Sequence, residues 1–269
     1  MTRRVVNNST SSSAVTPAVK SRAARSTIAI AVGNTSLIGA VFSGERQGLT
    51  FRIPATDLFK LARLAPRQID RAVICSVVPA LTPDVTRFVQ RTWELEPAIL
   101  TSKAPHGLKI GYRKPAELGT DRIAAALGAR AAYPDRDVIV VDCGTATTVT
   151  AIRRDNTILG GAILPGLSMW PEILALRTAQ LPRIELQRPP RALGRSTTDG
   201  IASGIFFGHL GALREVIGRI QTEAFPRSCI VIGTGGHADK FTGEKLFTAI
   251  NADLILQGLH VFAERSFRP

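Results

Sequence analysis

Three glycine-rich turns, each following an apolar stretch, are the places in this sequence where backbone and hydroxyl groups could bind phosphate. They are Gly33-Asn34-Thr35, Gly144-Thr145-Ala146-Thr147-Thr148 and Gly233-Thr234-Gly235-Gly236. Glycine lets the backbone approach a ligand closely, and successive N–H groups and threonine hydroxyls can donate to phosphate oxygens. Each turn taken alone is compatible with an ordinary tight turn. Three of them in this order fit a nucleotide held between two lobes.

Signatures of several other site classes are missing from the sequence. It has neither a Walker A sequence nor a Gly-x-Gly-x-x-Gly motif at a strand–helix junction, which disfavours P-loop and Rossmann nucleotide sites. The four histidines show no metal-ligand spacing, and no Ser-His-Asp set stands out. The three cysteines form no Cys-x-x-Cys pair, which argues against a disulfide framework or a zinc site. Such cysteine usage is typical of a reducing compartment, so we expect a cytoplasmic location.

The glycine turns must be held by the strands around them. Apolar residues at 28–32 and 37–42 flank the first turn, and those at 138–141 and 149–152 flank the second, so each unit predicts a β-hairpin. Aligning Gly33 with Gly144 places Ala31 opposite Asp142. The two units therefore look like copies of one hairpin motif, and only the second copy has a carboxylate, Asp142, at the aligned position.

Strands and helices alternate through the rest of the chain, which predicts an α/β architecture. The spacing of apolar residues predicts strands at 72–78, 98–101 and 229–232 and helices at 58–65, 83–93 and 117–133. It also predicts a helix that ends by residue 179 and a long helix, capped by Thr197 or Thr198, that ends by residue 226. We expect three parts: a disordered basic tail at 1–26, an N-terminal lobe at 27–134 and a C-terminal lobe at 135–269.

The charge balance adds a possible class of partner. The 269 residues include 34 Lys+Arg and 21 Asp+Glu, for a formal net charge of +13, and the segment 1–26 contains five basic residues and no acid. Basic charge favours binding to phosphate backbones, so nucleic acid is an alternative partner, although no DNA- or RNA-binding signature accompanies the charge. No apolar run reaches the roughly 20 residues of a membrane span, so we expect no membrane partner.

Six motifs, taken in order, resemble those of the type III pantothenate kinase family, which includes proteins named Bvg accessory factors. The resemblance covers nearly everything from Thr27 onward. It implies the fold of the acetate and sugar kinase, Hsp70 and actin superfamily, an α/β fold in which two ribonuclease-H-like lobes clasp ATP. The motifs are Gly33-Asn34-Thr35, Gly119-Thr120-Asp121-Arg122, the segment 141–148, the segment 160–166, Gly194-Arg195-Ser196-Thr197 and Thr234-Gly235-Gly236.

The resemblance also implies an activity. Members of the family use ATP to phosphorylate pantothenate to 4′-phosphopantothenate, the first step of coenzyme A biosynthesis. The expected cofactors are Mg²⁺ with ATP and a monovalent cation, K⁺ or NH₄⁺. The expected partners are pantothenate and a second copy of the chain, because family members are homodimers with the substrate pocket near the interface.

Matching the family's motifs residue by residue assigns roles to positions in this chain. Asp121 corresponds to the general base for the pantothenate hydroxyl, although an aspartate at a helix start is also favoured by the helix dipole. Asp142 corresponds to the ligand of the monovalent cation, and Thr145 to a contact of an ATP phosphate. The other implied nucleotide-binding residues are Gly33, Asn34, Thr35, Gly144, Gly235 and Gly236. The implied substrate-binding residues are Tyr112, Gly119, Thr120, Arg122 and Thr197, of which Thr197 could instead serve only as a helix N-cap.

One position departs from the family pattern. The family's first turn reads Asp-Val-Gly-Asn-Thr, whereas this chain has Ala31-Val32-Gly33-Asn34-Thr35. The missing aspartate is expected to help organise divalent metal and phosphates, and alanine has no oxygen for that task. Ala31 therefore predicts impaired catalysis. The alternative function is that of a catalytically weak or inactive pseudokinase or transcriptional regulator, similar to a Bvg accessory factor, that binds nucleotide or nucleic acid.

Overall fold

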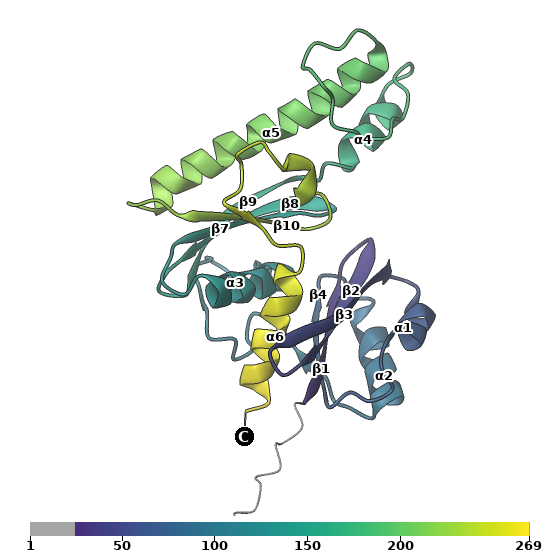
Figure 1. Cartoon of the computed structure of the whole chain (residues 1–269), viewed down its shortest axis with the longest axis vertical. Coiled ribbons are helices and arrows are strands. Elements are labelled where there is room, and N and C mark those ends of the chain that lie inside the picture. Colours follow the sequence, from purple (N-terminus) through teal and green to yellow (C-terminus); the bar gives the residue numbers. More distant parts are fainter. Residues whose placement is uncertain (1–24, 269) are drawn as a thin grey trace, which may run out of the picture.

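Two mixed β-sheets with a pair of helices between them make up the protein. We describe it from a computed structural model, which covers residues 25–268. Figure 1 shows the two sheets one above the other, with α3 (Thr120–Ala132) and α6 (Leu254–Ser266) in the layer that separates them. The tail predicted at 1–26 falls outside the described residues except for its last two positions, and the first strand begins at Ser26.

The two sheets repeat one topology. The first has the strand order β3-β2-β1-β4-β5, and the second has the order β6-β9-β8-β7-β10-β11. In each, a central strand pairs antiparallel with its hairpin partner and parallel with the strand on its other side. This repetition confirms the predicted fold of two ribonuclease-H-like lobes. The first sheet contains β1 (Ser26–Val32), β2 (Ser36–Ser43), β3 (Arg46–Pro54), β4 (Arg71–Ser76) and β5 (Ala98–Ile99). The second contains β6 (Lys109–Ile110), β7 (Val138–Cys143), β8 (Ala146–Arg153), β9 (Thr157–Pro165), β10 (Ile230–Thr234) and β11 (Ala249–Ile250).

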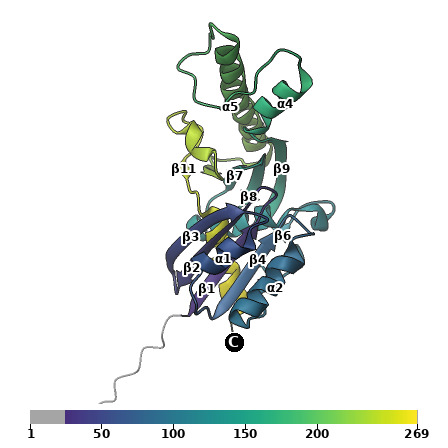
Figure 2. The same cartoon turned by 90° about the vertical axis from the view of Figure 1, so that its right-hand side faces the viewer.

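Helices cover the outer face of each sheet. The helices α1 (Leu58–Leu64) and α2 (Thr82–Trp93) lie on the outside of the first sheet. On the second sheet the outer layer is α5 (Thr197–Ala224), and α4 (Met169–Arg177) packs beside its N-terminal part, as Figure 2 shows. None of the helices in residues 25–268 combines the length and apolar character that a membrane span needs.

The central helices join the two lobes into one core. The helix α6 comes from the end of the chain yet packs on β1 and β4 of the first sheet, and it makes its largest contact with α3. Two glycines allow this close crossing, because a Cβ at Gly258 would lie 1.8 Å from the Ala124 carbonyl oxygen and one at Gly128 would lie 2.2 Å from the Leu254 carbonyl oxygen. The helix that carries Asp121 is thus fixed against both sheets.

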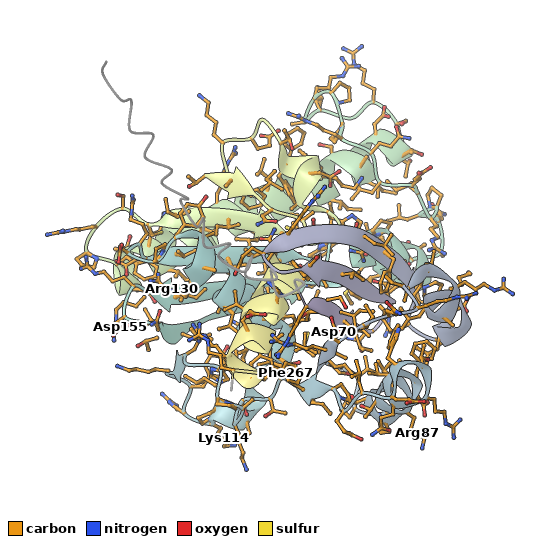
Figure 3. All side chains as sticks on the ribbon, turned by 60° about the horizontal axis from the view of Figure 1, so that its bottom comes forward. Asp70, Arg87, Lys114, Arg130, Asp155 and Phe267 are labelled. Atoms are coloured by element: carbon orange, nitrogen blue, oxygen red, sulfur yellow. The ribbon has the colours of Figure 1, made fainter. Side chains whose placement is uncertain are left out.

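Both ends of the described chain contact residues 70 and 71, at the start of β4. Asp70 accepts hydrogen bonds from the Ser26 backbone N–H (2.6 Å) and from its hydroxyl (2.9 Å), which fixes the start of β1. Figure 3 shows Phe267, at the end of α6, near the start of β4, where the Arg71 guanidinium lies 5.5 Å from its ring centre. The division of the chain at residues 134 and 135 stays a prediction.

Several elements differ from the sequence-based expectation. The strand β3 was not predicted, although its Leu49, Phe51 and Ile53 alternate with polar residues. The two-residue strands β6 and β11 were not predicted because they are too short to show a pattern and become strands only by pairing with a neighbour. The N-cap of α5 is Ser196, whose hydroxyl accepts from the Asp199 N–H at 3.1 Å, and not Thr197 or Thr198. Residues 178–196 form neither helix nor strand.

Candidate active site

The three glycine turns meet in one cleft between the two lobes. The cleft has a volume of about 180 Å³ and is lined by the turns after β1, β7 and β10 and by the first turn of α3. Each turn follows a buried central strand, so the topology of the two sheets brings them together. Nine of the predicted site residues line this cleft: Gly33, Asn34, Thr35, Asp121, Asp142, Gly144, Thr145, Gly235 and Gly236.

The first two turns touch each other across the cleft. The hydroxyl oxygens of Thr35 and Thr145 lie 2.9 Å apart and share a hydrogen bond, although the residues are 110 positions apart in the chain. Each turn is tightened by a backbone bond, from the Gly33 N–H to the Ser36 carbonyl (3.0 Å) and from the Gly144 N–H to the Ala146 carbonyl (3.2 Å). A phosphate bound between the turns would replace the bond between the two hydroxyls with bonds to its own oxygens.

Asp142 is a half-buried carboxylate at the end of β7, and it accepts no hydrogen bond from the described residues. Burial and the charge of Asp121 raise its pKa to about 7, and the Arg52 guanidinium opposes this rise. The third turn shields it, since a Cβ at Gly235, where φ is +84°, would lie 2.2 Å from the Asp142 Oδ1 atom. A carboxylate without a protein donor, facing a cleft, is suited to bind a cation.

Asp121 lies in the first turn of α3. Its Oδ1 atom accepts from the Arg122 backbone N–H at 2.8 Å. Burial raises the pKa of Asp121, although this hydrogen bond and the charge of Arg122 oppose the shift. Glycine at position 119 leaves room for this carboxylate, because a Cβ there would lie 2.5 Å from Oδ1 and would displace it. A raised pKa makes this carboxylate a stronger proton acceptor than an exposed aspartate.

The residues around Asp121 form a buried network next to the cleft. The Arg122 guanidinium donates to the Tyr112 hydroxyl at 2.5 Å, to the Thr150 hydroxyl at 2.9 Å and to the Val149 carbonyl at 3.0 Å. The Thr120 hydroxyl donates to the Ser76 carbonyl at 2.9 Å, which ties α3 to β4. These residues do not line the cleft itself.

Thr197 is not brought to the cleft of its own chain. It is exposed at the first position of α5, in the part of the molecule that projects farthest from the first lobe (Figure 1). The next residue, Thr198, lines a different cavity formed with residues 184–194. The substrate role of Thr197 stays a prediction that one copy of the chain does not explain.

Ala31 occupies the position in the first lobe that Asp142 occupies in the second. Ala31 pairs with Ile38 and Cys75 on the neighbouring strands, and Asp142 pairs in the same way with Thr148 and Thr234. Both residues line the cleft. Within residues 25–268, no three His, Cys, Asp or Glu side chains are grouped so that they could hold a metal ion. The cleft therefore contains two carboxylates, Asp121 and Asp142, and position 31, where an aspartate would add a third, carries alanine.

Sequence reasoning missed one charged residue of the cleft, Arg52 on β3. The available signal was the alternation of Leu49, Phe51 and Ile53 with polar residues, which predicts a strand with Arg52 on the face opposite these apolar side chains. Its place depends on the pairing of β3 with β2.

Comparison with known proteins identifies the family of the chain. The sequence model of the type III pantothenate kinase family matches residues 27–219. The chain belongs to this family. A type III pantothenate kinase of Legionella pneumophila is 38% identical over 249 residues, which is 88% of this chain and 97% of that protein. Family membership agrees with the family resemblance of the six sequence motifs.

Solved structures show the same fold at lower identity. A conserved Baf family protein from Campylobacter jejuni superposes with a TM-score of 0.60 at 20% identity, covering 89% of this chain and 98% of that one. A protein from Sinorhizobium meliloti named for 2-dehydro-3-deoxygalactonokinase gives a TM-score of 0.56 at 14% identity, covering 90% and 100%. These likenesses support the predicted α/β fold of the chain.

Proposed function

We propose that this protein transfers the γ-phosphoryl group of ATP to the hydroxyl group of pantothenate, which yields 4′-phosphopantothenate and opens coenzyme A biosynthesis. The observation that carries the proposal is the placement of Asp121 in one cleft with all three glycine turns. Membership of the type III pantothenate kinase family supports the choice of substrate. We propose the cytoplasm as the location, since all three cysteines are free thiols.

Asp121 acts as the general base in this proposal. As the new bond forms between the pantothenate oxygen and the γ-phosphorus, the bond from that phosphorus to the bridging oxygen of ADP breaks, and the hydroxyl proton passes to the Asp121 carboxylate. The hydroxyls of Thr35 and Thr145, on turns that the Gly33 and Gly144 backbone bonds hold in place, orient the phosphates. Mg²⁺ bound with ATP would supply positive charge to the phosphate oxygens.

The few oxygen ligands of the cleft suit a cation whose remaining ligands come from the phosphates of the substrate. Mg²⁺ is commonly bound by one or two carboxylates together with substrate phosphates, and Asp142 offers an oxygen donor without a protein partner. We propose Asp142 as a ligand of the monovalent cation, K⁺ or NH₄⁺. Arg122 and Tyr112, in the network beside Asp121, would bind pantothenate together with Gly119 and Thr120.

A homodimer is part of this proposal, and the outer face of α5 supports it. Gly200, Gly204, Gly208 and Gly211 are exposed on one side of this helix, and a Cβ at any of them would meet no other atom within 4 Å. Beside them α4 exposes Leu176, of which 78% is accessible. Small residues at this spacing allow a second helix to approach closely.

Dimerisation would also explain how Thr197 reaches a substrate, because a second copy could bring it to a cleft that its own chain does not. Light scattering should therefore give twice the mass of one chain, and Gly204→Leu should reduce it toward that of a single chain. A monomeric wild-type protein would contradict this part of the proposal.

A direct assay tests the activity. ADP release should depend on pantothenate when ATP, Mg²⁺ and K⁺ or NH₄⁺ are supplied, and it should disappear in Asp121→Asn. Turnover no higher than in a boiled sample would reject the proposal. A panel of other small hydroxyl compounds would show whether pantothenate is the preferred acceptor.

Ala31 favours a second candidate function, that of a regulator that binds nucleotide without transferring phosphate. Calorimetry that detects binding of ATP and pantothenate, combined with no turnover, would support it. The basic charge extends this candidate to nucleic acid. A gel-shift assay titrated with salt, beside a chain that lacks residues 1–26, would separate attraction by the tail from binding by the two lobes.

A further inference from the structure

Arg52 stands at one end of a row of side chains that forms the floor of the cleft. In the first sheet Arg52 pairs with Ile38, Ile38 pairs with Ala31, and Ala31 pairs with Cys75. Residues directly opposite one another on neighbouring strands point to the same face. All four residues line the cleft, so the row crosses it from the edge strand β3 to β4.

The Arg52 side chain is held over the cleft and reaches the other lobe. Its Nη1 atom donates to the Ser36 hydroxyl at 2.7 Å, and Ser36 closes the first glycine turn. Its Nη2 atom lies 4.0 Å from the place where a Cβ would stand on Gly236, in the third glycine turn. The guanidinium group therefore lies between turns of opposite lobes.

Arg52 is the only lysine or arginine among the residues that line this cleft, and its charge acts on the Asp142 carboxylate. None of the ion pairs found within residues 25–268 includes it. Its row contains alanine at position 31, so no carboxylate there competes for the guanidinium group. A planar cation fixed between phosphate-binding turns, with donors to spare, is suited to a phosphate oxygen.

We propose that Arg52 is a phosphate-binding residue of the nucleotide site and that its charge lets the cleft hold nucleoside di- and triphosphates when no divalent metal is present. This rests on the proposed nucleotide site but not on the transfer of phosphate to pantothenate. Arg52 would thus bind the nucleotide from the first lobe, while Asp121 acts on the acceptor.

Calorimetric titration of the full-length protein with adenosine, AMP, ADP and a non-hydrolysable ATP analogue tests the proposal, with EDTA and with Mg²⁺. In EDTA, Arg52→Gln should weaken binding of ADP and of the ATP analogue by about 10-fold to 100-fold, the value of one charge-assisted hydrogen bond. Binding of adenosine should not change. With Mg²⁺ the loss should be smaller, and Arg52→Lys should restore part of the affinity in EDTA.

Arg46 provides the matched control, because it is an exposed arginine of the same strand that lies six residues from Arg52 and outside the cleft. Arg46→Gln should leave all four affinities unchanged. The proposal is overturned if Arg52→Gln binds ADP as the wild type does, if it loses adenosine to the same degree, or if Arg46→Gln has an equal effect. Failure of pantothenate turnover with these affinities intact would reject the proposed kinase activity and leave the role of Arg52 in place.

Discussion

Replacing Ala31 with aspartate should increase catalysis and, without metal, reduce stability. Position 31 is 7% exposed, lines the cleft and matches Asp142 in the duplicated sheet, so a carboxylate there would point toward the bound phosphates. With Mg²⁺ and ATP present, a new oxygen ligand should raise kcat by at least about tenfold, which corresponds to about 1.4 kcal/mol of transition-state stabilisation.

The cost of Ala31→Asp follows from the charges already in the cleft. Two carboxylates about 7 Å apart in a medium with an effective dielectric constant of about 20 repel each other by about 2 kcal/mol. Asp121 and Asp142 are present already, and their mutual repulsion contributes to the raised pKa of Asp142. In EDTA the melting temperature should therefore fall by about 4 to 8 °C for a protein of this size.

Ala31→Asn separates charge from shape in this experiment, because the amide has the size of the carboxylate without its charge. The ADP-release assay and thermal melts in EDTA and in Mg²⁺ would be run on both variants and the wild type. We expect only the aspartate to raise kcat and only the aspartate to recover its melting temperature when Mg²⁺ and nucleotide are added. Equal rates in the two variants would refute the reasoning that Ala31 limits catalysis.

Three further predictions test the site and its support. Asp121→Asn should lower kcat by about 10² to 10⁴ and leave nucleotide affinity within about threefold, as measured by turnover and calorimetry. Because the pKa of Asp142 is raised to about 7, the folded state holds its proton longer than the unfolded state, so stability should fall as pH rises from about 4 to 7 without added cations. Asp142→Asn should remove that loss, up to about 4 kcal/mol, and urea unfolding at pH 4 and pH 8 would show whether the two proteins diverge. Gly258→Ala should cost about 3 kcal/mol or more because its Cβ would collide with the Ala124 carbonyl, whereas Gly218→Ala, exposed on α5 with no neighbour at its Cβ position, should change the unfolding free energy by less than about 1 kcal/mol.

The glycine hairpins could be predicted from the sequence because their signals are local. The strands β1, β2, β7 and β8 alternate or are continuously apolar, and each pair is separated by a short turn. The strand β3 was not predicted, although Leu49, Phe51 and Ile53 alternate with polar residues over the short stretch between Gly48 and Pro54. It becomes a strand because β2 offers it a hydrogen-bonding edge.

The site residues, like the strands, could be predicted where the signal is local. Asp121, Asp142 and the glycine turns belong to short motifs, and the alignment of Gly33 with Gly144 found Ala31 before the fold was known. The structure then showed the equivalence through strand register, with Ala31 and Asp142 on matching strands. The prediction that Thr197 or Thr198 caps α5 was wrong because Ser196, one residue earlier, reaches the Asp199 N–H.

The sequence by itself determined the family, the duplicated hairpins and the residue types that could act on phosphate, because each of these depends on a few neighbouring positions. Only the tertiary structure decided that Thr35 meets Thr145, that α6 returns to the first sheet and that Arg52 reaches over the cleft. These contacts join residues far apart in the chain, and they form only when two sheets of one topology face each other across a shared pair of helices. Their partners are set by strand register and helix packing, which no short stretch of sequence contains.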